Sequence, residues 1–145
     1  MYKAILVPTD GSNCSNTAID HALDLAGLFG ARLVFLNVIP TLLHSVRPGR
    51  DYVDKVIEDI KEASQRLLEE SCLKAKAKGV SCSSTSVEFS RPMDAIVDLA
   101  KAVDLIVMGS HGRGGIDRVL LGSVTEGVLR RVNKPVLVVR CTGDD

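Results

Sequence analysis

Five strand-like segments alternate with four amphipathic helical segments along this chain, and the alternation limits the fold more than any other feature. Most of the strand segments are continuous apolar runs, as expected of strands that are buried on both faces of a parallel sheet. The strands are expected at residues 3–9, 32–39, 80–89, 103–108 and 136–139, and the helices at 13–29, 51–78, 123–132 and from about 92. Strands that alternate with helices form right-handed crossover units. The 145 residues therefore predict one α/β domain with an open, doubly wound parallel sheet and helices on both faces.

The third strand segment, residues 80–89, differs from the others because serines and a threonine alternate in it with a few apolar residues. A weak and polar alternation of this kind is typical of a strand at the edge of a sheet. We therefore expect this segment at one margin of the sheet rather than in its centre.

A glycine-rich stretch joins the fourth strand to the last helix. It follows Met108 and contains Gly109, Gly112, Gly114, Gly115 and Gly122, with His111, Arg113 and Arg118 among them. Glycines let backbone N–H groups approach an anion without a Cβ in the way, and a helix N-terminus adds unpaired N–H groups and the positive end of its dipole. Ser123 is expected to be the N-cap of the helix, with Glu126 at the capping-box spacing. The stretch therefore predicts a phosphate-binding site.

A second group of polar residues follows the first strand, which ends at Pro8 and Thr9. Asp10 comes just past this strand, at the edge where open α/β sheets bind their ligands. Its carboxylate could accept hydrogen bonds from a ribose or a base. Alternatively, Asp10 or Ser12 only caps the helix that follows, and the residue types alone leave both interpretations open.

The two common phosphate-binding motifs, the P-loop and the dinucleotide fingerprint Gly-x-Gly-x-x-Gly, are both missing from the sequence. What is present is Gly109-x-x-Gly112, then nine residues, then Gly122-Ser123. This spacing resembles the nucleotide-binding motif of the universal stress protein family, in its ATP-binding subgroup. The resemblance extends over nearly the whole chain and includes Ile5–Asp10, Leu36–Val38 and Lys134–Val139.

The resemblance implies a Rossmann-like sheet of five strands in the order 3-2-1-4-5, with Asp10 and Gly109 facing each other across one crevice. It also implies an adenine nucleotide, with ATP first, in that crevice. The base would lie by Pro8, Asp10 and Val38, and the phosphates would run over Gly109, Gly112 and Arg113 to Gly122, Ser123, Val124 and Thr125. Thr9, Met108 and His111 complete the expected nucleotide contacts. Magnesium or manganese would be held through the phosphates, because no acidic cluster offers dedicated ligands.

The family resemblance further implies a homodimer. In this family the last strand commonly pairs with its twin across a two-fold axis, and here that strand is Val136, Leu137, Val138 and Val139. In a monomer these residues would form an exposed apolar edge, so pairing would remove a liability.

Three functions remain open at this point. The first is an ATP-binding regulatory protein of the stress response, a nucleotide-dependent switch with slow or no hydrolysis. The second is a slow ATP hydrolase or phosphotransfer enzyme that uses His111 or Asp10, although the sequence offers no convincing base for water. The third is a dimeric interaction module without nucleotide, against which the intact glycines argue.

Two segments near the expected site add further possibilities. The family usually has Gly-x-Pro where this chain has Ser90-Arg91-Pro92, which keeps Pro92 suited to the start of a helix and puts an arginine near the mouth of the site. Residues 41–50 are expected to be either a disordered connection or a flap that offers Arg47 or Arg50 to the phosphates.

Composition excludes several other partners. The formal net charge is zero and there is no Lys/Arg run, so nothing favours nucleic acid or an acidic membrane electrostatically. With no Trp and 3% aromatic residues, base-stacking platforms are not expected either. No apolar stretch approaches the roughly 18 residues of a membrane span, and no cleavable signal is apparent. We therefore expect a cytoplasmic protein.

The four cysteines, Cys14, Cys72, Cys82 and Cys141, are scattered and form no Cys-x-x-Cys pair. Neither a zinc site nor thioredoxin-like chemistry is indicated. We expect reduced thiols that behave as small apolar side chains. Cys14 differs from the other three because it lies near an expected helix N-terminus, where thiols can become reactive.

Overall fold

The computed structural model of the chain describes residues 1–39, 50–88, 90–112 and 120–141, without the side chains of residues 50 and 51. Its elements are β1 (Ala4–Pro8), α1 (Asn13–Phe29), β2 (Arg32–Ile39), α2 (Arg50–Ala77), β3 (Cys82–Glu88), α3 (Pro92–Ala100), β4 (Leu105–Gly109), α4 (Ser123–Arg131) and β5 (Val136–Val139). The strands pair in parallel in the order β3-β2-β1-β4-β5. The expected fold class is confirmed, and β3 lies at an edge as its polar sequence predicted.

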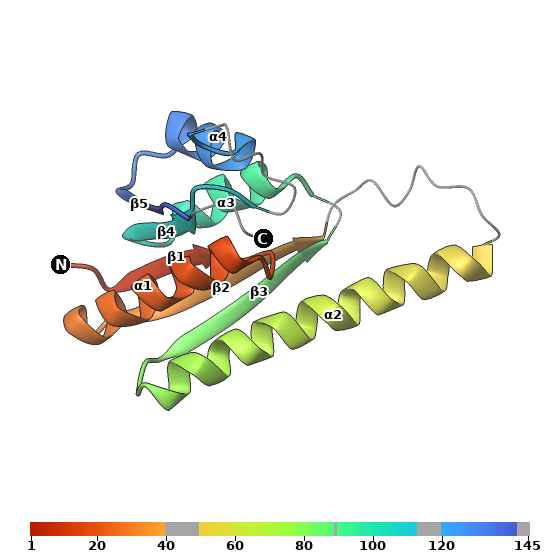
Figure 1. Cartoon of the computed structure of the whole chain (residues 1–145), viewed down its shortest axis with the longest axis horizontal. Coiled ribbons are helices and arrows are strands. Elements are labelled where there is room, and N and C mark those ends of the chain that lie inside the picture. Colours follow the sequence, from red (N-terminus) through yellow and green to blue (C-terminus); the bar gives the residue numbers. More distant parts are fainter. Residues whose placement is uncertain (40–49, 89, 113–119, 142–145) are drawn as a thin grey trace.

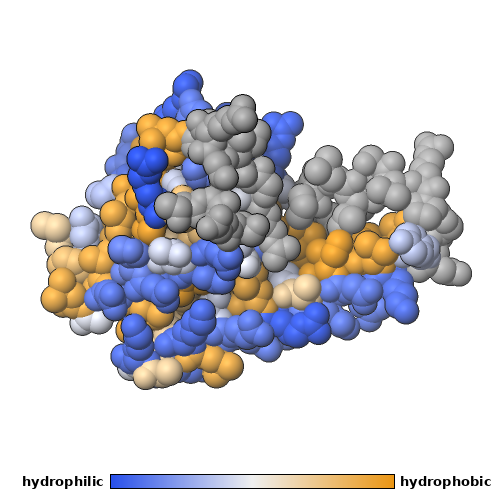
Figure 2. Space-filling model, viewed as in Figure 1, coloured by the Kyte–Doolittle hydropathy of each residue, from blue (hydrophilic) through white to orange (hydrophobic). Residues whose placement is uncertain are grey.

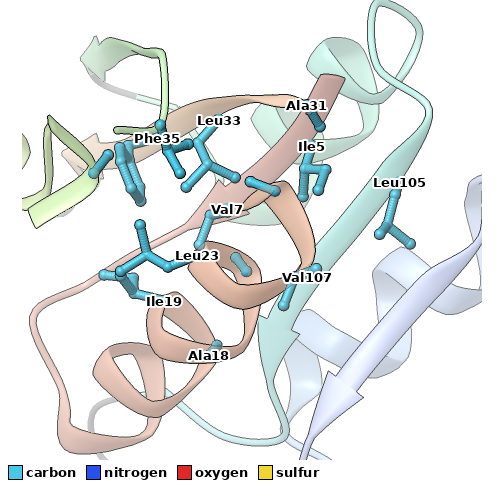
Figure 3. Packing of buried hydrophobic residues seen from close by; sticks show 14 of the residues in the cluster. Ile5, Val7, Ala18, Ile19, Leu23, Ala31, Leu33, Phe35, Leu105 and Val107 are labelled. Atoms are coloured by element: carbon cyan, nitrogen blue, oxygen red, sulfur yellow. The ribbon is translucent and has the colours of Figure 1, made fainter. Parts of the chain in front are cut away.

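Helices cover both faces of the sheet (Figure 1). Successive residues of a strand point to opposite faces, so Ile5 and Val7 pack in one core and Leu6 in the other. The first core contains residues from α1 and α2, and the second contains residues from α3 and α4. Figure 3 shows the first core, where Phe35 lies among aliphatic side chains from β1, β2 and α1. Burial on both faces explains why the central strands read as continuous apolar runs.

The ends of α1 follow from its sequence. The Ser12 hydroxyl accepts a hydrogen bond from the N–H of Ser15 at 3.1 Å, so Ser12 is the N-cap. At the other end Gly30 has φ 67°, in the left-handed region that glycine adopts without a Cβ clash. These two residues fix the ends of the helix, and of the two candidates for its N-cap, Asp10 and Ser12, it is Ser12 that caps it.

Helix α2 is longer than the sheet that it covers. It has 28 residues, and its N-terminal turns extend past the carboxyl ends of β2 and β3 in Figure 1. Val53, Val56 and Ile57 are half-buried along this overhang, where apolar surface is visible in Figure 2. The apolar stripe of α2 therefore continues beyond the sheet. No helix in the part of the chain that is described has both the length and the apolar character needed to cross a membrane.

Asp104 joins the amino ends of β1 and β4. Its carboxylate oxygen accepts hydrogen bonds from the N–H groups of Lys3, at 2.9 Å, and Ala4, at 3.0 Å. Hydrogen bonds to the ionised form hold the pKa of this carboxyl below its ordinary value of 3.8. The N–H of Asp104 donates in turn to the carbonyl of Ala4 at 2.9 Å. The contact fixes the spacing of β1 and β4 at their amino ends, which is the end of the strands opposite to the candidate site.

The expectation of four reduced thiols is wrong for this structure. Cys14 is bonded to Cys141 and Cys72 to Cys82, and no cysteine is free. The Cα atoms of the two pairs lie 5.5 and 5.8 Å apart, within the span that a disulfide bridges. Cys14 and Cys141 are 127 residues apart in the chain, so their spacing in the sequence gives no sign that the fold brings them together.

Candidate functional site

The middle of the sheet contains a topological switch point between β1 and β4. These strands are neighbours, but α1 packs in the core on one face and α4 in the core on the other. The chain therefore leaves the two strands in opposite directions, which opens a crevice at their carboxyl ends.

A cleft occupies this crevice. It is lined by Pro8, Thr9, Asp10, Ser15, Leu36, Asn37, Val38, Pro92, Ile96, Met108, Gly109, His111, Gly112, Val124 and Thr125. Ten of the thirteen residues that the sequence placed in the site are among them. Gly122 and Ser123 are not in the lining. Arg113 lies outside the described residues, and so does the segment 41–49, which includes Arg47. Two segments that are about a hundred residues apart thus meet, although their role in binding stays a prediction.

Thr9 and Asp10 are held in place by local hydrogen bonds. Thr9 is 4% exposed, its N–H donates to the carbonyl of Leu36 at 2.8 Å, and its hydroxyl lies 3.1 Å from that of Ser15. One carboxylate oxygen of Asp10, Oδ1, accepts from the N–H of Ser12 at 3.0 Å. Ser12 itself caps α1, so the capping role falls to Ser12 and the carboxylate of Asp10 remains at the lining of the cleft.

The two sides of the crevice touch at Gly112. A Cβ added to this residue would lie 2.7 Å from Oδ2 of Asp10, closer than carbon and oxygen atoms pack. A glycine at residue 112 therefore lets the loop after β4 approach the loop after β1 without displacing the Asp10 carboxylate. Without a Cβ, the backbone of a glycine can offer its N–H group to an anion at close range.

Helix α4 begins differently from the expectation. The N-cap is Gly122, which makes no side-chain capping bond, and Ser123 is the first residue of the helix. The expected capping box is therefore wrong, because the N–H of Gly122 donates instead to the carbonyl of Ser110 at 2.6 Å. This bond pulls the helix start toward the end of β4. The buried hydroxyl of Thr125 adds a bond of 2.9 Å to the carbonyl of Gly109, and the exposed Ser123 side chain takes no part.

Ser110, which the sequence reasoning passed over, supports the site from behind, between the lining residues Gly109 and His111. It is fully buried, and its N–H donates to the carbonyl of Val139 at 2.8 Å. Its hydroxyl lies 2.9 Å from Nδ1 of His111. With its carbonyl bound to Gly122, Ser110 connects β5, His111 and α4. In the sequence, only its place between Gly109 and His111 indicated that Ser110 belongs near the site, because serine itself has no strong preference for such a position.

Asn37 is a second residue that sequence reasoning did not place in the site. Its side-chain amide donates to the carbonyl of Thr9 at 2.8 Å. Its oxygen accepts from the hydroxyl of Ser64 on α2 at 2.7 Å, and Ser64 lies 3.0 Å from the hydroxyl of Ser86 on β3. A polar residue inside an otherwise apolar strand was the signal, and the chain of hydrogen bonds fixes the loop that carries Asp10.

The chemistry of the cleft changes from one end to the other. Val38, Ile96 and Met108 supply apolar surface, which suits the face of a planar ring. Gly109, Gly112 and the start of α4 supply backbone N–H groups, which suit an anion. Pro92 also lines the cleft, and it places the exposed Arg91, the N-cap of α3, beside the mouth. Among the described residues no group of three or more His, Cys, Asp or Glu side chains is placed to hold a metal ion.

The fold and the crevice define a doubly wound α/β protein with a cleft at its switch point. The chain belongs to the universal stress protein family, whose model matches residues 1–140. It is 37% identical over 142 residues to universal stress protein MJ0531 of Methanocaldococcus jannaschii, a match that covers 97% of this chain and 83% of that protein.

Two solved structures show the same architecture. That of MJ0577, a universal stress protein of Methanocaldococcus jannaschii, has a TM-score of 0.86 and 33% identity and covers 99% of each chain. That of a universal stress protein in complex with cAMP has a TM-score of 0.69 and 32% identity and covers 96% of this chain and 97% of the other. The second of these relatives binds an adenine nucleotide.

Proposed function

We propose that this chain binds an adenine nucleotide, ATP in the first instance, in the crevice between β1 and β4. Bound nucleotide makes it a regulatory switch of the stress response, with slow or no hydrolysis. The observation that supports this proposal most is the close approach of Gly112 to Asp10 in the lining of one cleft. It puts a carboxylate suited to the ribose beside glycine backbone suited to the phosphates. The cAMP bound to a relative 32% identical to this chain supports an adenine base.

In the proposed arrangement, the apolar end of the cleft holds the base and the glycine-containing end holds the phosphates. The base lies against Val38, Ile96 and Met108, and the Asp10 carboxylate accepts from the ribose hydroxyls. The phosphates lie along Gly109 and Gly112 toward the first turn of α4, where the helix dipole favours negative charge. Magnesium or manganese is held by phosphate oxygens, since the described residues offer no dedicated ligand cluster.

A regulatory role is preferred to an enzymatic one because the described residues do not supply all the groups that phosphoryl transfer needs. Catalysis needs a positioned nucleophile, metal ligands and a charge clamp. The hydroxyl of Ser110 lies 2.9 Å from Nδ1 of His111, and Oδ1 of Asp10 accepts from the N–H of Ser12. One polar atom of each side chain is thus engaged within the protein, and in the proposed arrangement the Asp10 carboxylate faces the ribose rather than the phosphates.

Calorimetric titration of the purified protein with ATP, ADP, AMP and GTP, each with Mg²⁺, tests the proposal. We expect micromolar binding of at least one adenine nucleotide, weaker binding of GTP, and no repeated turnover of ATP in a phosphate-release assay with ATP in excess over protein. Multiple turnovers that are lost in His111→Ala would favour the hydrolase instead. No binding of any adenine nucleotide at millimolar concentration would contradict the proposal and leave the dimeric interaction module.

We further propose a homodimer through β5. This strand is at the edge of the sheet, and Leu137 on it is 37% exposed while Val136 and Val138 are half-buried. Pairing with a second copy covers an apolar edge that would otherwise be open to other chains. Light scattering at micromolar concentration should give twice the mass of the chain, and Leu137→Lys should shift the mass toward one chain. A single-chain mass for the unaltered protein would contradict the proposal.

A further inference from the structure

The disulfide between Cys14 and Cys141 lies directly behind the candidate site. Cys14 is in the first turn of α1 and is 1% exposed. Cys141 follows β5 by two residues and is half-buried. The bond therefore connects the segment that follows β1 with the segment that follows β5, across the carboxyl end of β4.

Both sulfur atoms touch residues that form the wall of the crevice. A Cβ on Gly109 would lie 2.7 Å from Sγ of Cys14, so the end of β4 packs against this sulfur. The hydroxyl of Ser110 lies 3.5 Å from Sγ of Cys141 and 4.0 Å from Sγ of Cys14. The same hydroxyl lies 2.9 Å from Nδ1 of His111. Ser110 therefore connects the two sulfur atoms to His111 and, through its carbonyl, to Gly122 at the start of α4.

We propose that Cys14 and Cys141 are a reversible redox pair whose state regulates the affinity of the crevice for its nucleotide. The inference rests on the proposed function. A disulfide is reduced and formed again by thiol–disulfide exchange at a sulfur atom that a reagent can reach, and Cys141 is half-buried rather than fully buried. The other pair, Cys72 and Cys82, joins α2 to the amino end of β3, at the opposite edge of the sheet, so it is a control that the chain itself supplies.

The chemistry of reduction follows from the exposure of the two sulfur atoms. The thiolate of a dithiol reductant attacks Sγ of Cys141, which is the more exposed, and forms a mixed disulfide as the Cys14 sulfur leaves as a thiolate. The leaving thiolate lies at the N-terminus of α1, where the helix dipole favours negative charge. The second thiol of the reductant then attacks the mixed disulfide and releases Cys141, so the reductant becomes a disulfide and the protein gains two electrons and two protons. A small-molecule disulfide such as oxidised glutathione reverses the exchange.

Reduction should weaken nucleotide binding. Two sulfur atoms that are not bonded need more room than a bonded pair, and the space at Cys14 is closed by Gly109. Separation of the sulfurs therefore displaces the end of β4 or releases Cys141 from Ser110. Either change loosens the contacts that position His111 and Gly122, and a binding site that is less preorganised binds less tightly.

The test compares two matched double variants. Cys72→Ser/Cys82→Ser keeps only the pair behind the site, and Cys14→Ser/Cys141→Ser keeps only the remote pair. Each is oxidised with glutathione disulfide or reduced with dithiothreitol, its thiols are counted by alkylation and mass spectrometry, and ATP with Mg²⁺ is titrated into both forms. We expect the reduced form to bind about five-fold or more weakly in the first variant, the scale of common allosteric couplings, and a change below about two-fold in the second.

The proposal would be overturned if the two forms of the first variant bound ATP equally, or if both variants changed by the same factor. It would also be overturned if Cys14 and Cys141 formed no disulfide when oxidant is added. Unaltered protein gives the same comparison if the first variant does not fold. If no form binds ATP, ADP or AMP, the proposed function fails, and hydrogen exchange then decides the redox proposal separately. Faster exchange of residues 105–112 on reduction supports it, and equal exchange refutes it.

Discussion

Alanine in place of Asp10 is expected to weaken the binding of ATP by about ten-fold to a hundred-fold, because a charged acceptor that is removed from a hydrogen bond costs about 1.5–3 kcal/mol. Alanine in place of Gly112 should weaken it by a similar factor. The new Cβ would lie 2.7 Å from Oδ2 of Asp10, so the carboxylate must move away from the ribose or the loop must move away from the phosphates. Calorimetric titration of the two variants measures both effects.

The double variant Asp10→Ala/Gly112→Ala separates these two causes. If Gly112→Ala acts by displacing the carboxylate, removing that carboxylate relieves the clash, and the double variant binds no more weakly than Asp10→Ala. If the factors by which the two single variants weaken ATP binding multiply in the double variant, Gly112 acts through the phosphates alone. Asp20→Ala on the exposed face of α1 is the charge-matched control and should bind as the unaltered protein does. Unchanged affinity in both single variants would place the nucleotide elsewhere.

Alanine at Gly109 and alanine at Gly27 are expected to change the free energy of unfolding in opposite directions. A Cβ on Gly109 would lie 2.7 Å from Sγ of Cys14 and 3.2 Å from its backbone carbon and oxygen. Backbone atoms in the first turn of a helix cannot move aside freely, so we expect a loss of about 1–3 kcal/mol. Gly27 is an exposed helical residue with nothing within 4 Å of an added Cβ, and there alanine should stabilise by about 0.5–1 kcal/mol.

Denaturant unfolding of the two glycine variants, both kept oxidised, measures this difference directly. The comparison holds the chemical change constant and varies only the surroundings of the Cβ. Gly109→Ala should also bind nucleotide more weakly, because Thr125 donates to the carbonyl of Gly109 at 2.9 Å and a shift of β4 carries the start of α4 with it. A Gly109→Ala protein as stable as the unaltered chain would show that the end of β4 is not packed against α1 in the way described.

The fold was largely predictable because its signals are local. The apolar runs of β1 and β2, the polar alternation of β3, and Gly30 at the end of α1 each specify an element through the residues within it. The order of the strands is not local, and it came from the resemblance to the family rather than from periodicity. The ends of β3 and β4 were misplaced by one or two residues because apolar residues such as Val80 and Val103 precede these strands and are themselves buried.

The candidate site was predictable only where a residue has a chemically distinctive side chain or, as in glycine, no side chain. Asp10 and the glycines stand out in the sequence for that reason. Ser110 and Asn37 act through partners that only the fold supplies, and serine or asparagine alone signals nothing. Ser123 was misassigned as an N-cap because a serine side chain can cap a helix, yet the carbonyl of Ser110 binds the N–H of Gly122 and sets the helix start one residue earlier. The pairing of Cys14 with Cys141 is hidden for the same reason, since it depends on where β5 ends.

Amide chemical-shift mapping of isotope-labelled protein during titration with ATP and Mg²⁺ tests most directly whether the crevice between β1 and β4 binds the nucleotide. The largest shifts should fall on residues 9–12, 37–39, 108–112 and 120–125, which lie at the carboxyl ends of β1, β2 and β4 and at the start of α4. The structure offers a second hollow between α2 and β3, lined in part by Lys61, Gln65 and Glu88. Shifts gathered at that hollow, with the amides around Asp10 and Gly112 unmoved, would contradict the account.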